Sequence, residues 1–241
     1  MTTADVLVLV HETDVELGMR KVGTLADGVA DAGARIVVGT LIGPSGLLTE
    51  PPDPSGFRAV VVMGSPEGAA DDEGLPWLAG ELAYVRRAVE VGTPVLGVCF
   101  GGQLLARALG GSVGRAPLGE HGFVRVATAA PELVPTGPWM QFHADRFTLP
   151  PGARRLAWTD RAEQAFTVGP HLGVQFHPEI TADVFDAWNE GNRASGVDAE
   201  LAAAGIDVPA IRADIVERAE QARTACRELV ARFLEADQPQ K

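Results

Sequence analysis

The sequence is poor in lysine and cysteine. Lys21 and Lys241 are its only lysines, and it contains no GxxxxGKS or GxxxxGKT string, which argues against Schiff-base chemistry and against an ATP-binding phosphate loop. Its two cysteines, Cys99 and Cys226, lie far apart and outside any CxxC or His/Cys cluster. This spacing argues against a disulfide framework and a structural zinc site, and it makes a single reactive thiol the more interesting interpretation.

Basic side chains and long apolar runs are also scarce. The chain has 20 Lys and Arg residues against 32 Asp and Glu residues, a net charge of −12, which repels nucleic acid. No apolar run approaches the roughly 18 residues that a membrane span needs, and the N-terminus lacks a basic segment followed by a long apolar one. We therefore expect a cytoplasmic protein with no nucleic-acid partner and no membrane contact.

What the sequence does contain is an alternation of short apolar runs with amphipathic stretches. Its 241 residues, 46% of them apolar, suffice for one generous α/β domain. Such an alternation is typical of parallel strands covered by helices on both faces, whose carboxyl ends meet at one edge of the sheet. We therefore predict an open, mostly parallel sheet with its functional residues at that edge. The predicted strands are Val6–Val10, Ile36–Val38, Ala59–Met63 and Val95–Val98, and the predicted helices are Leu17–Ala32 and Leu75–Val91.

The second half has shorter segments separated by Pro and Gly turns, which predict strands that extend or flank the main sheet. Beyond Pro178 helical spacing predominates. Asp207 followed by Pro209 marks the start of a long predicted helix, Pro209–Glu235, with one apolar stripe. The predicted short strands are Phe123–Ala127, Arg154–Thr159, Gln164–Val168 and Leu172–Phe176.

Cys99 stands between an apolar strand and a predicted helix, with Gly97 two residues before it and Gly101 two residues after it. Small residues at these positions are typical of a nucleophile elbow, a sharp turn between a strand and a helix in which a side chain at either position would collide with the backbone across the turn. The helix N-terminus at such a turn favours a thiolate and offers N–H groups to an oxyanion. Taken alone, the pattern fits a buried cysteine in a glycine-rich turn better.

His177 is the candidate base for this thiol. It follows an apolar run, so it reaches the same sheet edge as Cys99 if the two strands are parallel. Glu179 can hold the far ring nitrogen, and Pro178 stiffens the step between them. By itself the pair is better explained as a strand-end histidine with an exposed glutamate. Together with the Cys99 elbow, it favours a catalytic triad.

These motifs resemble those of class I, triad-type, glutamine amidotransferases, which carry GxCxGxQ and HPE. The resemblance spans nearly the whole chain and looks most like the stand-alone members related to the amidotransferase half of GMP synthetase. It implies a flavodoxin-like α/β fold, with a catalytic domain in residues 1–180 and a helical C-terminal extension, residues 181–241, packed on the same domain. The matching segments are Pro76–Leu78 with Glu81, Pro94–Cys99, Gln103–Ala106, Leu109–Gly111, Gln141–Phe147, Gln164–Phe166 and Gln175–Glu179.

The resemblance implies a role for each member of the triad. Cys99 attacks the side-chain amide carbon of glutamine, His177 passes a proton to the departing ammonia, and Glu179 orients and charges the imidazole. A glutamyl thioester then hydrolyses to glutamate. Neither a metal nor a cofactor takes part in this chemistry.

An oxyanion hole is implied between the N–H of Phe100 and an N–H of the loop that contains Gly64 and Ser65. Members of the family usually have two glycines before the proline of this loop, so Ser65 is a departure from the pattern. A serine makes a peptide flip in the loop costlier than a glycine does. We therefore expect either a permanently formed hole or a weak glutaminase.

The substrate pocket is implied by two further segments. Gln103 matches the residue that holds the amino-acid end of the substrate. Phe142, His143 and Ala144 match part of a substrate-binding loop that in many relatives reads Ser-His-Gly-Asp. Phe142 and Ala144 replace the serine and the glycine, which makes the expected pocket wall bulkier and more apolar, while His143 is expected to brace the loop.

Three functions remain open from the sequence. The first is a glutaminase that releases ammonia to a separate synthetase subunit. The second is a stand-alone γ-glutamyl hydrolase or peptidase, and the third is a non-catalytic regulatory module of the same fold, against which the complete Cys–His–Glu set argues. Other polar clusters are expected to be structural: His11–Glu12 as a solvated loop pair, Asp71–Glu73 as a solvated loop, and Cys226 as a core residue.

Overall fold

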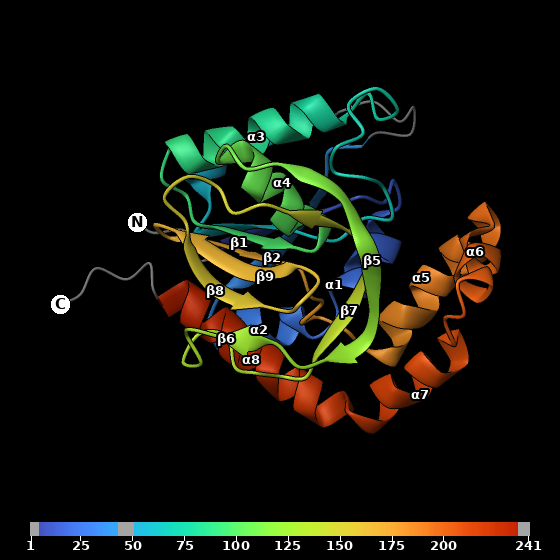
Figure 1. The fold of residues 1–241 in the computed structure, drawn as a ribbon. Coiled ribbons are helices and arrows are strands. Elements are labelled where there is room, and N and C mark those ends of the chain that lie inside the picture. The colour runs from blue at the N-terminus through green and yellow to red at the C-terminus, as the bar shows by residue number, and fades with distance from the viewer. Residues whose placement is uncertain (1–4, 43–50, 236–241) are drawn as a thin grey trace.

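The computed structural model describes residues 5–42 and 51–235, and an eight-stranded sheet forms its centre (Figure 1). Five adjacent strands, β2-β1-β3-β4-β10, run parallel, and β9, β8 and β6 extend the sheet in antiparallel pairs. The predicted open, mostly parallel sheet is therefore confirmed. The bounds are β1 (Asp5–Val10), β2 (Arg35–Thr40), β3 (Ala59–Val62), β4 (Val95–Val98), β6 (Ala127–Thr128), β8 (Arg154–Trp158), β9 (Glu163–Val168) and β10 (His171–Val174).

Helices cover both faces of the sheet. In β1, Val6, Val8 and Val10 face one side and Leu7 and Leu9 face the other, because successive side chains of a strand alternate. The first side packs against α2 and α8, and the second packs against α3 and α4, which lie above the sheet in the view of Figure 1. These helices and their neighbour are α1 (Val15–Val22), α2 (Leu25–Asp31), α3 (Leu78–Glu90), α4 (Phe100–Ala108) and α8 (Ala219–Glu235).

The helix predicted over Leu17–Ala32 is wrong in one respect, because the structure divides it at Gly23. This glycine has φ 54° and ends α1. A Cβ at Gly23 would lie 2.1 Å from the carbonyl oxygen of Glu179, so the glycine permits a close approach between two chain segments that are distant in sequence. The break thus brings the turn between α1 and α2 against the HPE segment.

The C-terminal region is helical as predicted, but its long predicted helix is also divided. Asp207 caps α7 by accepting a hydrogen bond from the Ala210 N–H at 2.9 Å, and the helix ends at Arg218, directly before α8. None of the described helices is long and apolar enough to cross a membrane. The remaining helices are a 3-10 turn (Pro54–Gly56), α5 (Ala182–Ser195), α6 (Val197–Ala203) and α7 (Val208–Glu217).

The final helix packs tightly on the sheet domain. Cys226 on α8 is fully buried among apolar side chains, which confirms its predicted place in the core. A Cβ at Gly28 of α2 would lie 2.8 Å from Val230 Cβ, so the two helices approach closely at this point. An exposed ion pair between Arg223 and Asp27 borders the contact.

A second, two-stranded sheet was not predicted. It pairs β5 (Val113–Val124) with β7 (Trp139–Phe147) in antiparallel register and curves along one side of the molecule in Figure 1. The predicted strand Phe123–Ala127 covers only the end of β5, and the expected loop around residues 141–145 lies within β7. Glycine, proline and charged residues interrupt the apolar alternation of β5, so its strand conformation depends on pairing with β7.

Candidate active site

Cys99 lies in the sharp turn between β4 and α4. Its φ of 50° and ψ of −106° make it the one non-glycine residue with positive φ in the described part of the chain. A Cβ at Gly97 would lie 2.3 Å from the Gly101 carbonyl oxygen, and a Cβ at Gly101 would lie 2.0 Å from that of Val62. Only glycine fits at either position, and the turn has the geometry expected of a nucleophile elbow.

The neighbouring strand brings His177 to the same edge. β10 runs parallel to β4 with Val174 opposite Val98, and the Cys99 N–H donates to the Val174 carbonyl at 2.8 Å. Three residues further on, the His177 N–H donates to the Met140 carbonyl of β7 at 2.8 Å. The position of Cys99 therefore depends on a backbone hydrogen bond to β10, and that of His177 on one to β7 of the second sheet.

Glu179 accepts a hydrogen bond from the His177 imidazole, with Nδ1 and Oε1 2.8 Å apart and both side chains buried. Burial by itself lowers the pKa of His177. The charge of Glu179 and the interaction with the Cys99 sulfur outweigh this effect and raise that pKa to about 10. The three side chains can thus hold an imidazolium between the Cys99 sulfur and the Glu179 carboxylate.

The HPE segment is anchored from two sides. Thr24, in the turn between α1 and α2, donates from its N–H to the Glu179 carbonyl at 3.1 Å and from its hydroxyl to the Pro178 carbonyl at 3.2 Å. On the other side, the Trp188 ring of α5 packs edge-on against the His177 ring with centroids 4.5 Å apart. The C-terminal helices therefore supply part of the surroundings of this imidazole.

The loop after β3 lies beside the Cys99 and His177 side chains. A Cβ at Gly64 would lie 3.1 Å from His177 Cε1 and 3.8 Å from Cys99 Cβ, so the loop after β3 passes directly beside both side chains. Within the described residues, neither the Ser65 N–H nor the Phe100 N–H donates a hydrogen bond to the protein. Both groups are in the segments expected to form the oxyanion hole.

His11 differs from its expected role. It is not solvated: its ring is buried, with Nδ1 3.1 Å from the Gly64 carbonyl oxygen and Nε2 3.1 Å from Glu81 Oε1. Burial lowers the pKa of His11, but the charge and hydrogen bond of Glu81 outweigh it, and the pKa is raised above its usual range. The neighbouring Glu12, expected to be solvated as well, is largely buried and forms an ion pair with Lys21.

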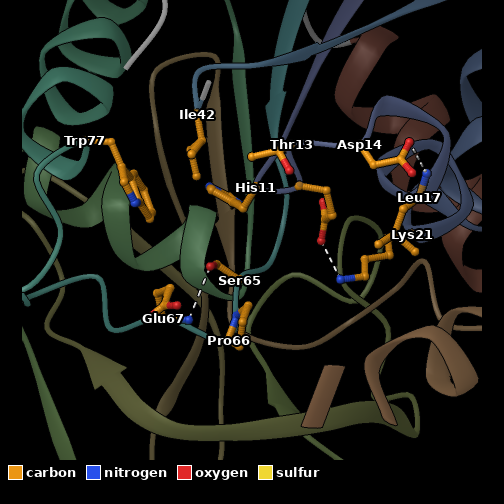
Figure 2. A pocket seen from close by; sticks show the side chains of 11 residues that line it. His11, Thr13, Asp14, Leu17, Lys21, Ile42, Ser65, Pro66, Glu67 and Trp77 are labelled. Carbon is orange, nitrogen blue, oxygen red and sulfur yellow. Dashed lines mark hydrogen bonds and ion pairs between the residues drawn. The ribbon is translucent and has the colours of Figure 1, made fainter. Parts of the chain in front are cut away.

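A pocket of about 410 Å³ adjoins the same loop on the His11 side, at the carboxyl edge between β1 and β3, and Figure 2 shows the side chains that line it. The chain order of the strands reverses between these two strands, which is where open α/β sheets commonly form a crevice. Ser65 and Pro66 from the loop line the pocket together with Ile42 and Trp77.

Gln175 is not among the site residues predicted from the sequence, although it belongs to the segment that resembles the family. Its side-chain amide lies 3.6 Å from Cys99 Sγ in hydrogen-bonding geometry, and its Oε1 accepts from Gln103 Nε2 at 3.2 Å. Gln103 also donates to the Asp145 carbonyl at 3.3 Å and is buried. Gln103 therefore contacts the thiol through Gln175; its expected contact with the substrate stays a prediction.

The expected substrate-binding residues of β7 point in different directions. Phe142 packs edge-on against Phe185, with ring centroids 5.8 Å apart, and lies 5.9 Å from the Trp188 ring. His143 is buried on the other side, with Nδ1 2.9 Å from the Asp145 carbonyl oxygen and Nε2 3.3 Å from Glu120 Oε2. Ala144 lies beside it on the Phe142 side of the strand.

Comparison with known proteins places this arrangement in a family. Residues 42–189 match the family model of class-I glutamine amidotransferases. The chain belongs to this family. The matched residues include all three members of the Cys99, His177 and Glu179 set.

Curated relatives carry the name GMP synthase (glutamine-hydrolysing). That of Thermosynechococcus vestitus is 36% identical over 137 residues, which cover 53% of this chain and 24% of the relative. That of Aeropyrum pernix is 36% identical over 143 residues, which cover 54% of this chain and 26% of the relative. The amidotransferase chain thus matches only about a quarter of the length of these relatives.

Two solved structures are similar over almost the whole chain. A glutamine amidotransferase of Thermotoga maritima has a TM-score of 0.78 at 27% identity and covers 96% of this chain and 98% of its own. A glutamine amidotransferase of Methylobacillus flagellatus has a TM-score of 0.79 at 26% identity, and the match covers 100% of this chain and 98% of its own. The likeness therefore extends through the C-terminal helices.

Proposed function

We propose that the protein hydrolyses the side-chain amide of glutamine through a cysteinyl thioester and releases ammonia for a separate acceptor enzyme. The observation that carries the proposal is the meeting of Cys99, His177 and Glu179 at one sheet edge, with the Nδ1–Oε1 distance at 2.8 Å. Membership of the class-I glutamine amidotransferase family supports the choice of glutamine. In this proposal neither a metal nor a cofactor participates.

Acylation uses the protonated His177. The Cys99 thiolate attacks the amide carbon, and the carbonyl oxygen becomes an oxyanion between the Ser65 and Phe100 N–H groups. His177 then donates its proton to the amide nitrogen, the C–N bond breaks, and ammonia leaves. Glu179 stabilises the imidazolium before this transfer because its carboxylate lies against Nδ1.

Deacylation reverses the direction of proton transfer. His177, now neutral, takes a proton from a water molecule that attacks the thioester carbon. The same two N–H groups hold the second oxyanion, and collapse of this intermediate breaks the C–S bond, releases glutamate and restores the Cys99 thiolate. One imidazole therefore serves first as acid and then as base.

A separate acceptor is part of this proposal. The named relatives are glutamine-hydrolysing GMP synthases, and the match to this chain covers only about a quarter of their length. Because the match leaves about three quarters of these synthases uncovered, we propose that a separate synthetase partner receives the ammonia. We also propose that residues 1–180 form the catalytic domain and that residues 181–241 form an extension of it, since Trp188 contacts the triad histidine.

A second candidate function is hydrolysis of another γ-glutamyl amide or peptide. Phe142, Phe185 and Trp188 form a group of aromatic rings that ends against His177. A leaving group larger than ammonia would find apolar contacts there, because aromatic rings offer large apolar surfaces. This observation favours a γ-glutamyl compound without displacing glutamine as the first choice.

The deciding experiment measures kcat/KM of the purified protein for glutamine and for a panel of γ-glutamyl peptides and amines. The panel is run alone and with cell extract, and Cys99→Ala serves as the inactive control. We expect slow glutamine hydrolysis that a co-purifying partner accelerates. Fast turnover of one γ-glutamyl compound, unaffected by extract, would establish the second function instead.

A further inference from the structure

His11 lies between two hydrogen-bond acceptors. A backbone carbonyl can only accept, so the 3.1 Å contact with the Gly64 oxygen requires a hydrogen on Nδ1. The 3.1 Å contact between Nε2 and Glu81 Oε1 requires a second hydrogen, on Nε2, and the charge of Glu81 favours this doubly protonated ring by raising the pKa of His11 despite burial. The doubly protonated ring donates from Nδ1 to Gly64 and from Nε2 to Glu81, so Glu81 favours the form of the imidazole that binds the loop.

The direction of the Gly64 carbonyl also fixes the direction of the next N–H. The Gly64–Ser65 peptide bond is trans, so its C=O and N–H groups point in opposite directions. With the carbonyl directed at His11, the Ser65 N–H is directed away from it. A Cβ at Gly64 would lie 3.1 Å from His177 Cε1 and 3.8 Å from Cys99 Cβ, so both side chains lie next to this peptide bond.

We infer that His11 and Glu81 form a clamp that holds the Gly64–Ser65 peptide with its N–H toward the attacking sulfur of Cys99. His11 is thereby a positioning residue for the oxyanion hole. The inference rests on the proposed amide hydrolysis, because it assigns a function to an N–H group that matters only when an oxyanion forms.

Ring packing keeps the His11 imidazole in place. The Phe100 ring lies edge-on to it with centroids 4.7 Å apart, and the Trp77 ring lies 5.6 Å away, as part of the pocket wall in Figure 2. Phe100 also supplies the second N–H of the expected hole. His11 therefore contacts both segments that form the hole, through the Gly64 carbonyl and through the Phe100 ring.

Ser65 is the second element that resists reversal of the peptide. Reversal would rotate the φ of Ser65 into the positive region, which is unfavourable for a non-glycine residue. Pro66 further restricts the backbone of the residue before it, and the Ser65 hydroxyl accepts from the Glu67 N–H at 3.2 Å. Because Ser65 resists reversal independently, the contribution of His11 is best measured after Ser65 has been replaced by glycine.

The test compares His11→Asn with His11→Gln, each alone and in a Ser65→Gly background. The amide nitrogen of asparagine can occupy the place of Nδ1 and donate to Gly64, whereas that of glutamine can occupy the place of Nε2 and reach only Glu81. We expect His11→Gln to lower kcat roughly tenfold alone and roughly 100-fold with Ser65→Gly, while KM changes less than about twofold. His11→Asn should stay within about threefold of its parent.

If His11 only fills space or provides a hydrogen bond to Glu81, glutamine replaces it better than asparagine does. The kcat of His11→Gln should then exceed that of His11→Asn, and this result would also overturn the clamp. Equal kcat values for the two variants in the Ser65→Gly background, or a loss confined to KM, would overturn the clamp. Thermal unfolding of each variant monitors folding. Should the unpaired Glu81 prevent folding, the same pairs are made with Glu81→Gln, which leaves a neutral partner at this position.

Crystal structures of the two Ser65→Gly double variants supply a readout that does not depend on activity. The Gly64 carbonyl should point to residue 11 in the asparagine variant and away from it in the glutamine variant. If the wild-type protein hydrolyses no γ-glutamyl compound but the carbonyls differ in this way, the proposed function is wrong and the clamp stands. Identical carbonyl directions in both variants refute the clamp whatever the activity.

Discussion

Replacing Glu179 by glutamine tests the electrostatic part of the proposed triad. The carboxylate lies 2.8 Å from His177 Nδ1 and is buried, and an amide of the same size preserves the packing. At an effective dielectric constant near 20, two opposite charges about 4 Å apart attract each other by about 4 kcal/mol. Since each 1.36 kcal/mol corresponds to a factor of ten, this attraction limits the loss to about 10³ in kcat. We expect a loss of roughly 10²- to 10³-fold.

The pH profile should change in a defined direction. Glu179 and Cys99 raise the pKa of His177 from 6.5 to about 10. In the proposed mechanism the protonated ring is the acid that releases ammonia. Activity of the wild-type protein should therefore fall as pH rises through about 10. In Glu179→Gln the pKa of His177 is lower, so this alkaline limb moves to lower pH.

Stability offers an independent measurement of the same interaction. Because folding raises this pKa, the folded state binds the proton more tightly, and the resulting stabilisation is complete below about pH 6.5 and lost as pH rises through about 10. Urea unfolding of the wild type and of Glu179→Gln across this range should show the difference shrinking at high pH. The exposed Glu132→Gln is the matched control. An unchanged kcat with an unmoved alkaline limb in Glu179→Gln would refute the assignment of Glu179.

Three further predictions concern other parts of the site. A glutamine-like alkylating agent should label Cys99 and leave Cys226 unlabelled in the native protein, because burial raises the pKa of Cys226 to about 12; equal labelling by peptide mapping would contradict this. Gly101→Ala should lower Tm and reduce the free energy of unfolding by about 1–3 kcal/mol, because its Cβ would lie 2.0 Å from a backbone oxygen. An unchanged Tm would be inconsistent with the elbow geometry. Trp188→Ala should lower kcat/KM about threefold to tenfold through loss of its contact with His177, and steady-state rates equal to wild type would show that the helical extension does not act on the imidazole.

The parallel sheet and the elbow were predictable because their signals are local. Each buried strand is a short apolar run, and the glycines flanking Cys99 stand at fixed offsets from it. The helix breaks at Gly23 and Arg218 were not predicted, since the apolar spacing continues across both positions. At Gly23 the reason is tertiary: the break permits a contact with Glu179, which is far away in the sequence.

The environment of His11 could not be predicted from its neighbours in the chain. Its partners Gly64 and Glu81 lie 53 and 70 residues away, on different elements, and no short motif links them. A histidine next to a glutamate at a strand end is ordinary loop composition, so the local sequence predicts a solvated pair. Gln175 is different, because it stands two residues before His177 in a segment that already resembles the family.

The hydrogen bond between the Cys99 N–H and the Val174 carbonyl joins the proposed nucleophile to the strand that leads to the proposed base, His177. Cys99 directly follows β4 and His177 lies three residues beyond β10, so the distance between thiol and imidazole depends on the β4–β10 ladder at the centre of the sheet and on the hydrogen bond from the His177 N–H to β7. Amide protons in such central strands exchange only when a large part of a domain opens. Thermal inactivation should therefore occur at the same temperature as cooperative unfolding of the sheet domain. No state with a folded sheet and a disordered catalytic centre should precede it.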